Sequence, residues 1–199
     1  VVTEANIEER KNKISHNNPN RFDRNHFYQA LMSNSIFNAA CNMLRMDLFD
    51  QTHTDRKIFS SRIAPNQQIL LPLYFHYNRG FIDEPLSIFL IRQGSVSHPQ
   101  KTLEIELNRG IEYRNILFHT LESINMPNDL LELYKRRVEI NVQKDFVLFG
   151  YIYNDLALLE NGLRFLEQHN EAIPEYYLYR KKMKSKLFQF RRYISRKIK

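Results

Sequence analysis

Hydrophobic residues recur at spacings of three and four through most of the C-terminal half, and this pattern predicts consecutive amphipathic helices. The first helix begins near Thr102, and Pro127 ends its pattern. A second helix follows, and Gly150 is expected to separate it from a third helix over about 154–168. A turn over 170–174 precedes a last helix. We therefore expect a helical appendage over residues 100–175.

The pattern before residue 100 mixes short helical and extended segments. A helix is expected over 23–32 and one helical turn over 45–49. Pro65 suits the first turn of a further helix, which Pro72 should kink by removing the bond to the Gln68 carbonyl. Three segments are rich in β-branched and aromatic residues and are predicted as strands: 35–44, 81–83 and 86–92.

Composition places the chain among globular proteins, since 43% of its 199 residues are hydrophobic and 13% are aromatic. Cys41 is the single cysteine, so no intramolecular disulfide can form, and a reducing compartment is expected. The longest nearly apolar run, 69–75, is much shorter than the roughly 20 residues of a membrane-spanning helix. The chain begins with Val1 rather than Met, which we interpret as a piece of a longer protein.

The net charge of +7 is concentrated at the C-terminus. Residues 180–199 contain ten Lys and Arg and no acid, which leaves 19 basic and 22 acidic residues in the rest of the chain. Apolar residues in this region recur at spacings of three and four: Tyr179, Met183, Leu187, Phe190, Ile194 and Ile198. Residues 176–199 are therefore predicted to form a basic amphipathic helix that lies on an anionic membrane surface. The alternative is that the apolar stripe packs on the preceding helices.

Several classes of chemistry lack their usual patterns. The seven His show no metal-ligand spacing, the five Gly form no phosphate-binding loop, and no nucleophile elbow is present. Two stretches in the predicted α/β part do carry polar side chains in a distinctive order. They read SRIAPNQQILLPL over 61–73 and GFIDEPLSIFLIRQGSVSH over 80–98.

These two stretches, in this order, resemble the second half of family-two glycosyltransferases of the GT-A fold. Such enzymes move a sugar from a nucleotide-diphosphate donor to an acceptor with inversion. The resemblance implies an α/β, helix-rich fold in which a partial GT-A-type mixed sheet is followed by a C-terminal helical appendage. Residues 1–99 would form the C-terminal part of the catalytic domain, 100–175 the appendage and 176–199 the basic tail.

The resemblance also implies the candidate site residues. The family places a general-base Asp at the position of Asn66, and an amide cannot take up a proton at neutral pH, so Asp83 is the second catalytic candidate. Acceptor-binding roles fall on Gln67, Gln68 and Arg45, because amides and guanidinium groups can orient sugar hydroxyls. A loop over the donor diphosphate would contribute Arg92, Ser95, Ser97 and His98. The alternative for the amides is that they only satisfy the helix N-terminus.

The donor-binding half of the family is not found in this sequence. No Asp-x-Asp motif occurs in the 199 residues, so the chain alone is expected to be inactive and to hold no cofactor. The intact enzyme would use a divalent metal, Mn or Mg, on the donor diphosphate. The implied partners are a nucleotide-sugar donor, a surface-polysaccharide or lipid-linked acceptor and an anionic membrane on the cytoplasmic side, without nucleic acid. The alternative function is a non-enzymatic helical module whose basic tail binds an anionic polymer such as RNA.

Overall fold

The structure, a computed structural model, describes residues 27–32, 42–59, 65–77 and 102–185 together with Phe190 and Tyr193. About 80% of these residues are helical and none lies in a strand, so the prediction of an α/β fold with a partial GT-A-type mixed sheet is wrong. The end of one predicted strand, residues 42–44, is irregular, and Met43 is 81% exposed. β-Propensity depends on a partner strand and on burial, and the described ranges contain no strand that could pair with these residues. The predicted strands over 81–83 and 86–92 lie outside the described residues.

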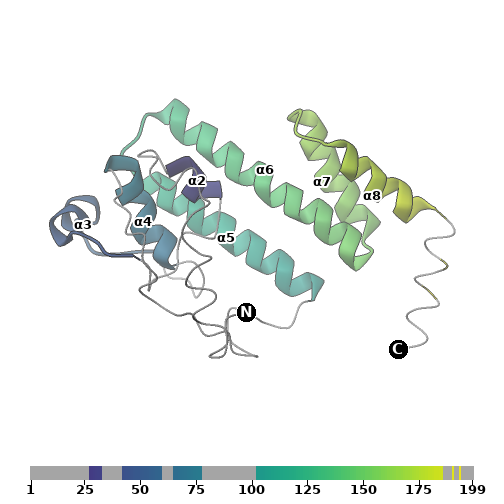
Figure 1. The fold of residues 1–199 in the computed structure, drawn as a ribbon, viewed down its shortest axis with the longest axis horizontal. Helices are drawn as coiled ribbons and strands as arrows, with labels where there is room; N and C mark the ends of the chain where they lie inside the picture. The colour runs from purple at the N-terminus through teal and green to yellow at the C-terminus, as the bar shows by residue number, and fades with distance from the viewer. Residues whose placement is uncertain are drawn as a thin grey trace, which may run out of the picture. The chain divides into compact units, whose positions relative to one another are not determined.

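The chain divides into two compact units. The first comprises Val1–Gln100 with Asn115–Glu132, and the second comprises Lys101–Arg114 with Leu133–Lys199. Two long helices, α5 (Leu103–Ser123) and α6 (Asn128–Tyr153), follow one another in the chain (Figure 1). Each of them contributes residues to both units. Pro127 stands between them, as the sequence predicts, since a proline donates no backbone hydrogen bond to a continuing helix.

The first unit contains three shorter helices: α2 (Phe27–Met32), α3 (Met46–Thr52) and α4 (Pro65–His76). Both α2 and α3 pack against α4, and the Phe27 ring meets the Phe75 ring edge-on at 5.1 Å between centroids. The buried apolar side chains of this unit come from α2, α4, the second half of α5 and the residue after it: Phe27, Ala30, Leu31, Leu70, Leu71, Leu73, Tyr74, Ile116, Leu117, Leu121 and Ile124. This core holds α4 in place.

The helix predicted behind Pro65 is confirmed. It starts at Pro65, where the missing N–H removes no helical bond, and Pro72 lies inside it. Its buried residues include two glutamines, Gln67 and Gln68, as well as apolar side chains on several sides. α4 is therefore an interior helix whose first turn carries buried amides.

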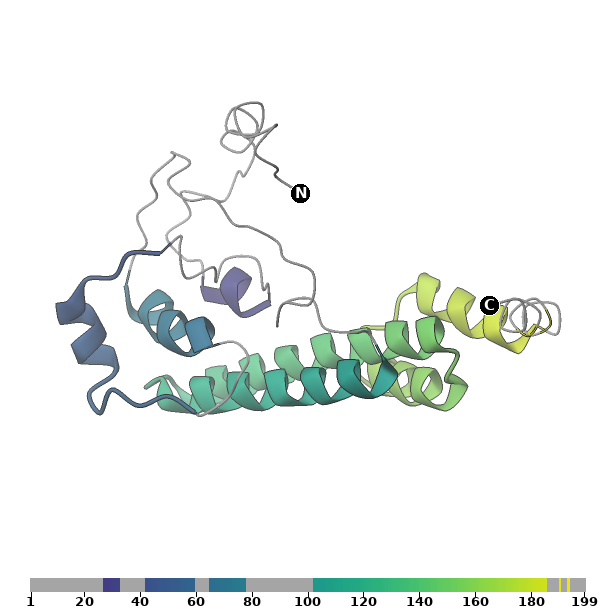
Figure 2. The same ribbon diagram turned by 90° about the horizontal axis from the view of Figure 1, so that it is seen from below.

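The second unit packs α7 (Leu156–Gln168) and α8 (Pro174–Lys184) with the later part of α6 (Figure 2). Its core contains buried side chains from all three helices: Ile140, Val147, Leu159, Leu163, Leu166 and Met183. A turn separates α6 from α7, with Asn154 in the left-handed region at φ 60°. Asp155 then caps α7, because its Oδ1 accepts a hydrogen bond from the Leu158 backbone N–H at 2.9 Å.

Gly150 does not end the second long helix, contrary to the sequence prediction, because α6 continues to Tyr153. The glycine instead permits a close approach to α7. A Cβ at this position would lie 2.6 Å from the Leu159 backbone nitrogen and 2.9 Å from the Asp155 carbonyl oxygen. Gly162 on α7 has the matching role, since a Cβ there would lie 2.9 Å from Val147 Cγ2. Both glycines serve packing.

The predicted tail helix over 176–199 is interrupted early. α8 ends at Lys184, and Ser185 is extended. Two members of the predicted lipid-facing stripe lie in the core instead: Met183 is buried, and the Tyr179 ring stacks on Tyr151 at 4.3 Å. The Tyr179 hydroxyl donates to the Glu175 carboxylate, which raises the tyrosine pKa to about 12. This part of the stripe packs on the protein, as the alternative interpretation holds.

Candidate functional site

The candidate site lies in the first unit, where the loop after α3 meets the first turns of α4. His53 is buried and its ring stacks on Phe49 at 4.6 Å. Its Nε2 atom lies 3.1 Å from the Gln68 carbonyl oxygen. In a regular helix this carbonyl would accept from residue 72, but Pro72 has no N–H. His53 therefore supplies the donor that Pro72 removes.

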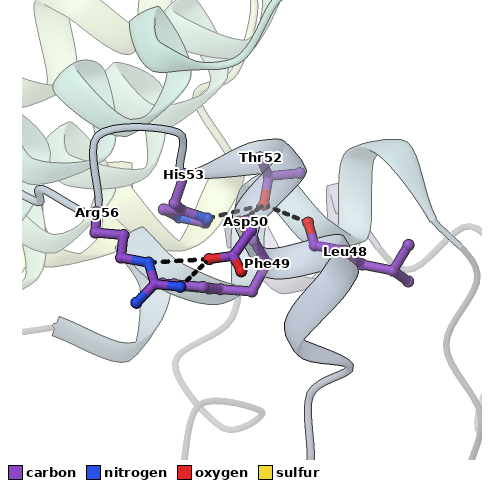
Figure 3. A network of polar contacts seen from close by, with 6 residues as sticks. All are labelled: Leu48, Phe49, Asp50, Thr52, His53 and Arg56. Atoms are coloured by element: carbon purple, nitrogen blue, oxygen red, sulfur yellow. Dashed lines mark hydrogen bonds and ion pairs between the residues drawn. The ribbon is translucent and has the colours of Figure 1, made fainter.

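Each nitrogen of the His53 ring has a hydrogen-bond partner, and Figure 3 shows the contact with Thr52. A carbonyl only accepts, so Nε2 carries a proton. Nδ1 lies 2.8 Å from Thr52 Oγ1, which is also 3.1 Å from the Leu48 and Phe49 carbonyl oxygens. A neutral ring accepts the Thr52 proton at Nδ1, whereas an imidazolium donates there and Thr52 turns its proton to a carbonyl. Both nitrogens are engaged in either state, and the bond from Nε2 to the Gln68 carbonyl makes His53 a positioning residue for α4.

The loop that presents His53 is tied back to α3. Arg56 lies in the left-handed region at φ 52°, an unusual backbone conformation for a non-glycine residue. Its guanidinium donates twice to Asp50 Oδ1, at 2.9 and 2.6 Å (Figure 3). Because this ion pair is exposed, its own contribution to stability is small, and its effect is to hold the loop geometry.

The amides of the first turn of α4 are the chemically distinctive feature of the site. Gln67 is 2% exposed and Gln68 is 5% exposed. The Gln68 Nε2 atom has no hydrogen-bond acceptor within the described part of the chain. A buried amide that leaves its two N–H donors unpaired costs about 1–3 kcal/mol, so a bound oxygen acceptor at this position would recover that free energy. Asn66, one residue before this pair, is half-buried.

The three predicted acceptor-binding residues differ in burial and in their partners. Arg45 precedes α3, its side chain is 73% exposed, and its guanidinium binds Asp47 with contacts of 3.1 and 2.5 Å. The hydrogen bond from Arg45 lowers the pKa of Asp47. Gln67 and Gln68 are buried in α4, whereas Arg45 uses its donors on its own helix. The structure thus keeps the two glutamines together and assigns Arg45 a local role.

The remaining predicted site residues lie outside the described ranges: Asp83, Arg92, Ser95, Ser97 and His98. Their roles stay predictions. In the described residues no group of three or more His, Cys, Asp or Glu is arranged to hold a metal ion. The divalent metal that the resemblance implies remains a prediction for the intact enzyme.

His53 and Thr52 are not among the site residues that the sequence predicts. One signal was available: Pro72 was expected to leave the Gln68 carbonyl without its helical donor. A buried carbonyl requires a partner, so a donor from elsewhere in the chain was implied. Nothing in the local sequence identifies His53 as that donor, because it lies 15 residues earlier.

Comparison of the chain with protein-family profiles, curated proteins and solved structures gave no match.

Proposed function

We propose that this chain is the acceptor-binding part of a nucleotide-sugar glycosyltransferase that acts on a surface-polysaccharide or lipid-linked glycan. The observation that carries the proposal is the Gln68 amide, which is buried in α4 with its Nε2 donors unpaired in the described part of the chain. Sugar hydroxyls accept and donate hydrogen bonds in the geometry that amides offer. The order of the stretches over 61–73 and 80–98 supports the same assignment.

The proposed reaction is a direct displacement. The acceptor hydroxyl attacks the anomeric carbon of the donor sugar, the new glycosidic C–O bond forms, and the C–O bond to the diphosphate breaks. The hydroxyl proton passes to a carboxylate, for which Asp83 is our candidate, because an amide at Asn66 orients a hydroxyl without removing its proton. Arg92, Ser95, Ser97 and His98 would stabilise the leaving diphosphate through hydrogen bonds. The reaction would take place on the cytoplasmic face of a membrane.

A glycan-binding screen tests this proposal on the chain as it exists. Saturation-transfer NMR with a panel of bacterial surface oligosaccharides should reveal at least one ligand without a nucleotide sugar present. The signal should disappear in Gln68→Met, which keeps the side-chain length and removes the amide. Gln168→Met is the matched control, because Gln168 is exposed on α7. Failure of every glycan to bind, or equal binding by both variants, would contradict the proposal.

A second function is favoured by aromatic residues that are exposed on α8 and after its end. The Arg180 guanidinium lies 5.2 Å from the centroid of the Tyr177 ring, and Phe190 and Tyr193 are 61% and 56% exposed. Exposed aromatic residues interleaved with basic residues are typical of surfaces that bind single-stranded nucleic acid. A fluorescently labelled single-stranded RNA should then bind with strong salt dependence. Absence of RNA binding at low salt would rule this function out.

A further inference from the structure

The second unit exposes a face of α8 that combines apolar and cationic side chains. Tyr176, Tyr179 and Met183 point to the core of the unit, at spacings of three and four residues. Tyr177, Leu178 and Lys181 therefore lie on the opposite side of the helix, and Arg180 and Lys182 lie on its flanks. We define the outer α8 face by these residues: Tyr177, Leu178, Arg180, Lys181 and Lys182.

The apolar members of this face are accessible. Leu178 is 53% exposed and Tyr177 is 37% exposed, and Ile173 at the start of the helix is 43% exposed. The chain thus leaves two aliphatic side chains and one aromatic ring at the surface next to its most basic segment. An aliphatic side chain contributes little to binding nucleic acid, where affinity comes from phosphate contacts and base stacking.

The charge of α8 is strongly asymmetric. The helix has four cations and one acid, Glu175, which accepts from Tyr179. Lys184 is paired with Glu160 on α7 at 2.5 Å, whereas Lys181 and Lys182 are exposed and form no ion pair within the described ranges. The sequence that follows adds six more Lys and Arg and no acid. The charge fits an anionic partner.

We infer that the outer α8 face is a contact surface for an anionic lipid bilayer. Leu178 and Tyr177 would enter the boundary between head groups and acyl chains, while Arg180, Lys181 and Lys182 bind lipid phosphates. The hydrophobic pattern predicts that the stripe with Tyr179 and Met183 faces the lipid, but both residues pack in the core. The lipid-facing side of α8 is therefore the opposite side. Bilayer contact requires no spanning segment, and none of the described helices combines the length and apolar character needed to cross a membrane.

A single-tryptophan experiment tests which side of the helix meets the bilayer. The chain has no Trp, so Leu178→Trp introduces one reporter on the outer α8 face. Its emission should shift to the blue with phosphatidylglycerol-containing vesicles and be quenched by brominated lipid. Leu133→Trp is the control, because Leu133 is 46% exposed on α6 and lies outside this face. An unchanged Leu178→Trp spectrum on bound vesicles, or equal shifts in both variants, would overturn the inference.

A charge-matched pair tests the cationic part of the surface. Lys181→Gln/Lys182→Gln should lower the affinity for anionic vesicles by about fivefold or more, since each cation at such a surface is attracted to the lipid phosphates. Arg109→Gln/Arg136→Gln removes the same charge from exposed positions on α5 and α6 and should change the affinity much less. Equal losses in the two variants would attribute binding to net charge alone and overturn the inference.

The vesicle experiments use neither a sugar donor nor a glycan, so their outcome is independent of the proposed function. Circular dichroism of each variant confirms that the helices are intact. Single-stranded RNA added to Leu178→Trp provides the competing outcome. If RNA changes the emission and vesicles do not, the outer α8 face binds nucleic acid and the lipid inference is wrong.

Discussion

At the scale of single residues, the central feature is a backbone carbonyl of α4 whose helical donor is replaced by a side chain from outside the helix. Pro72 removes the N–H that would bind the Gln68 carbonyl, and the His53 ring replaces it from the loop after α3. The replacement joins α3 to α4 and holds the turn that carries Gln67 and Gln68. The position of the candidate amides therefore depends on a residue outside their own helix.

A double-mutant cycle measures this dependence. His53→Leu should lower the free energy of unfolding by about 1–3 kcal/mol, because it leaves the buried carbonyl without a donor. In a Pro72→Ala background the helix regains its own N–H, so the same His53→Leu change should cost about 1 kcal/mol less. Urea unfolding of the four proteins gives the coupling free energy. Identical costs in both backgrounds would show that His53 does not compensate for the proline.

At the scale of elements, the second unit depends on close contact between α6 and α7. Gly150 and Gly162 provide the space, and the α7–α8 turn is held to α6 through Glu171. The Glu171 carboxylate accepts from Arg137 at 2.5 Å and from Lys144 at 2.9 Å. Its side chain is only 24% exposed, so these contacts lie partly out of water.

Alanine substitutions of two glycines should have different effects. Gly150→Ala gains about 1 kcal/mol of helix propensity but forces a Cβ against the α7 backbone, and overpacking costs about 1–3 kcal/mol. We expect a net loss of stability. Gly110→Ala on α5 is the control, since its Cβ would meet the Phe146 ring at 3.2 Å, which a side chain can relieve. A lower melting temperature for Gly110→Ala than for Gly150→Ala would contradict the packing role of Gly150.

The ion pairs of Glu171 predict a pH dependence of stability. The hydrogen bond from Lys144 lowers the pKa of Glu171 in the folded state, and the hydrogen bond from Arg137 lowers it further. The stabilisation is present above the ordinary glutamate pKa of about 4.3 and is lost as the pH falls through the lower folded value. Glu171→Gln should flatten the decline of the urea midpoint between about pH 6 and about pH 3, whereas Glu104→Gln should not. An unchanged slope in Glu171→Gln would refute this assignment.

The sequence predicted the helices of the C-terminal half and the start of α4, because helical periodicity, Pro65 and Pro127 act locally. It was wrong where the outcome depends on tertiary contacts. Gly150 was expected to end a helix but serves close packing. Residues 42–44 were expected to end a strand, but the described ranges contain no strand that could pair with them. Gln67 and Gln68 were identified from their residue type, whereas His53 required the three-dimensional contact across 15 residues.

At the scale of the whole molecule, we propose that glycan binding and bilayer binding belong to different units. In this proposal the amides on α4 of the first unit bind the glycan, and the outer α8 face of the second unit binds an anionic bilayer. This division predicts that glycan binding and vesicle binding respond to different substitutions. Gln68→Met should leave vesicle affinity unchanged, and Lys181→Gln/Lys182→Gln should leave glycan affinity unchanged, as measured by co-sedimentation and NMR titration. Loss of both glycan binding and vesicle binding in either variant would contradict the division.

The purified chain should not transfer or hydrolyse a donor sugar. The sequence contains no Asp-x-Asp motif, which family-two glycosyltransferases use to hold the metal on the diphosphate. Incubation with a panel of nucleotide-diphosphate sugars and manganese, followed by measurement of released nucleotide, checks this expectation. Release above the rate without protein would show that the chain contains its own donor site.

The central claim is that the buried Gln68 amide lowers the free energy of unfolding and, in return, binds a sugar hydroxyl. Calorimetric titration of the best glycan against Gln68→Met, with urea unfolding of the same protein, tests it most directly. The account predicts that affinity falls about tenfold or more while the free energy of unfolding stays equal or rises, since a buried unpaired amide has been removed. Unchanged affinity together with a large loss of stability would show that Gln68 is only a structural residue of α4.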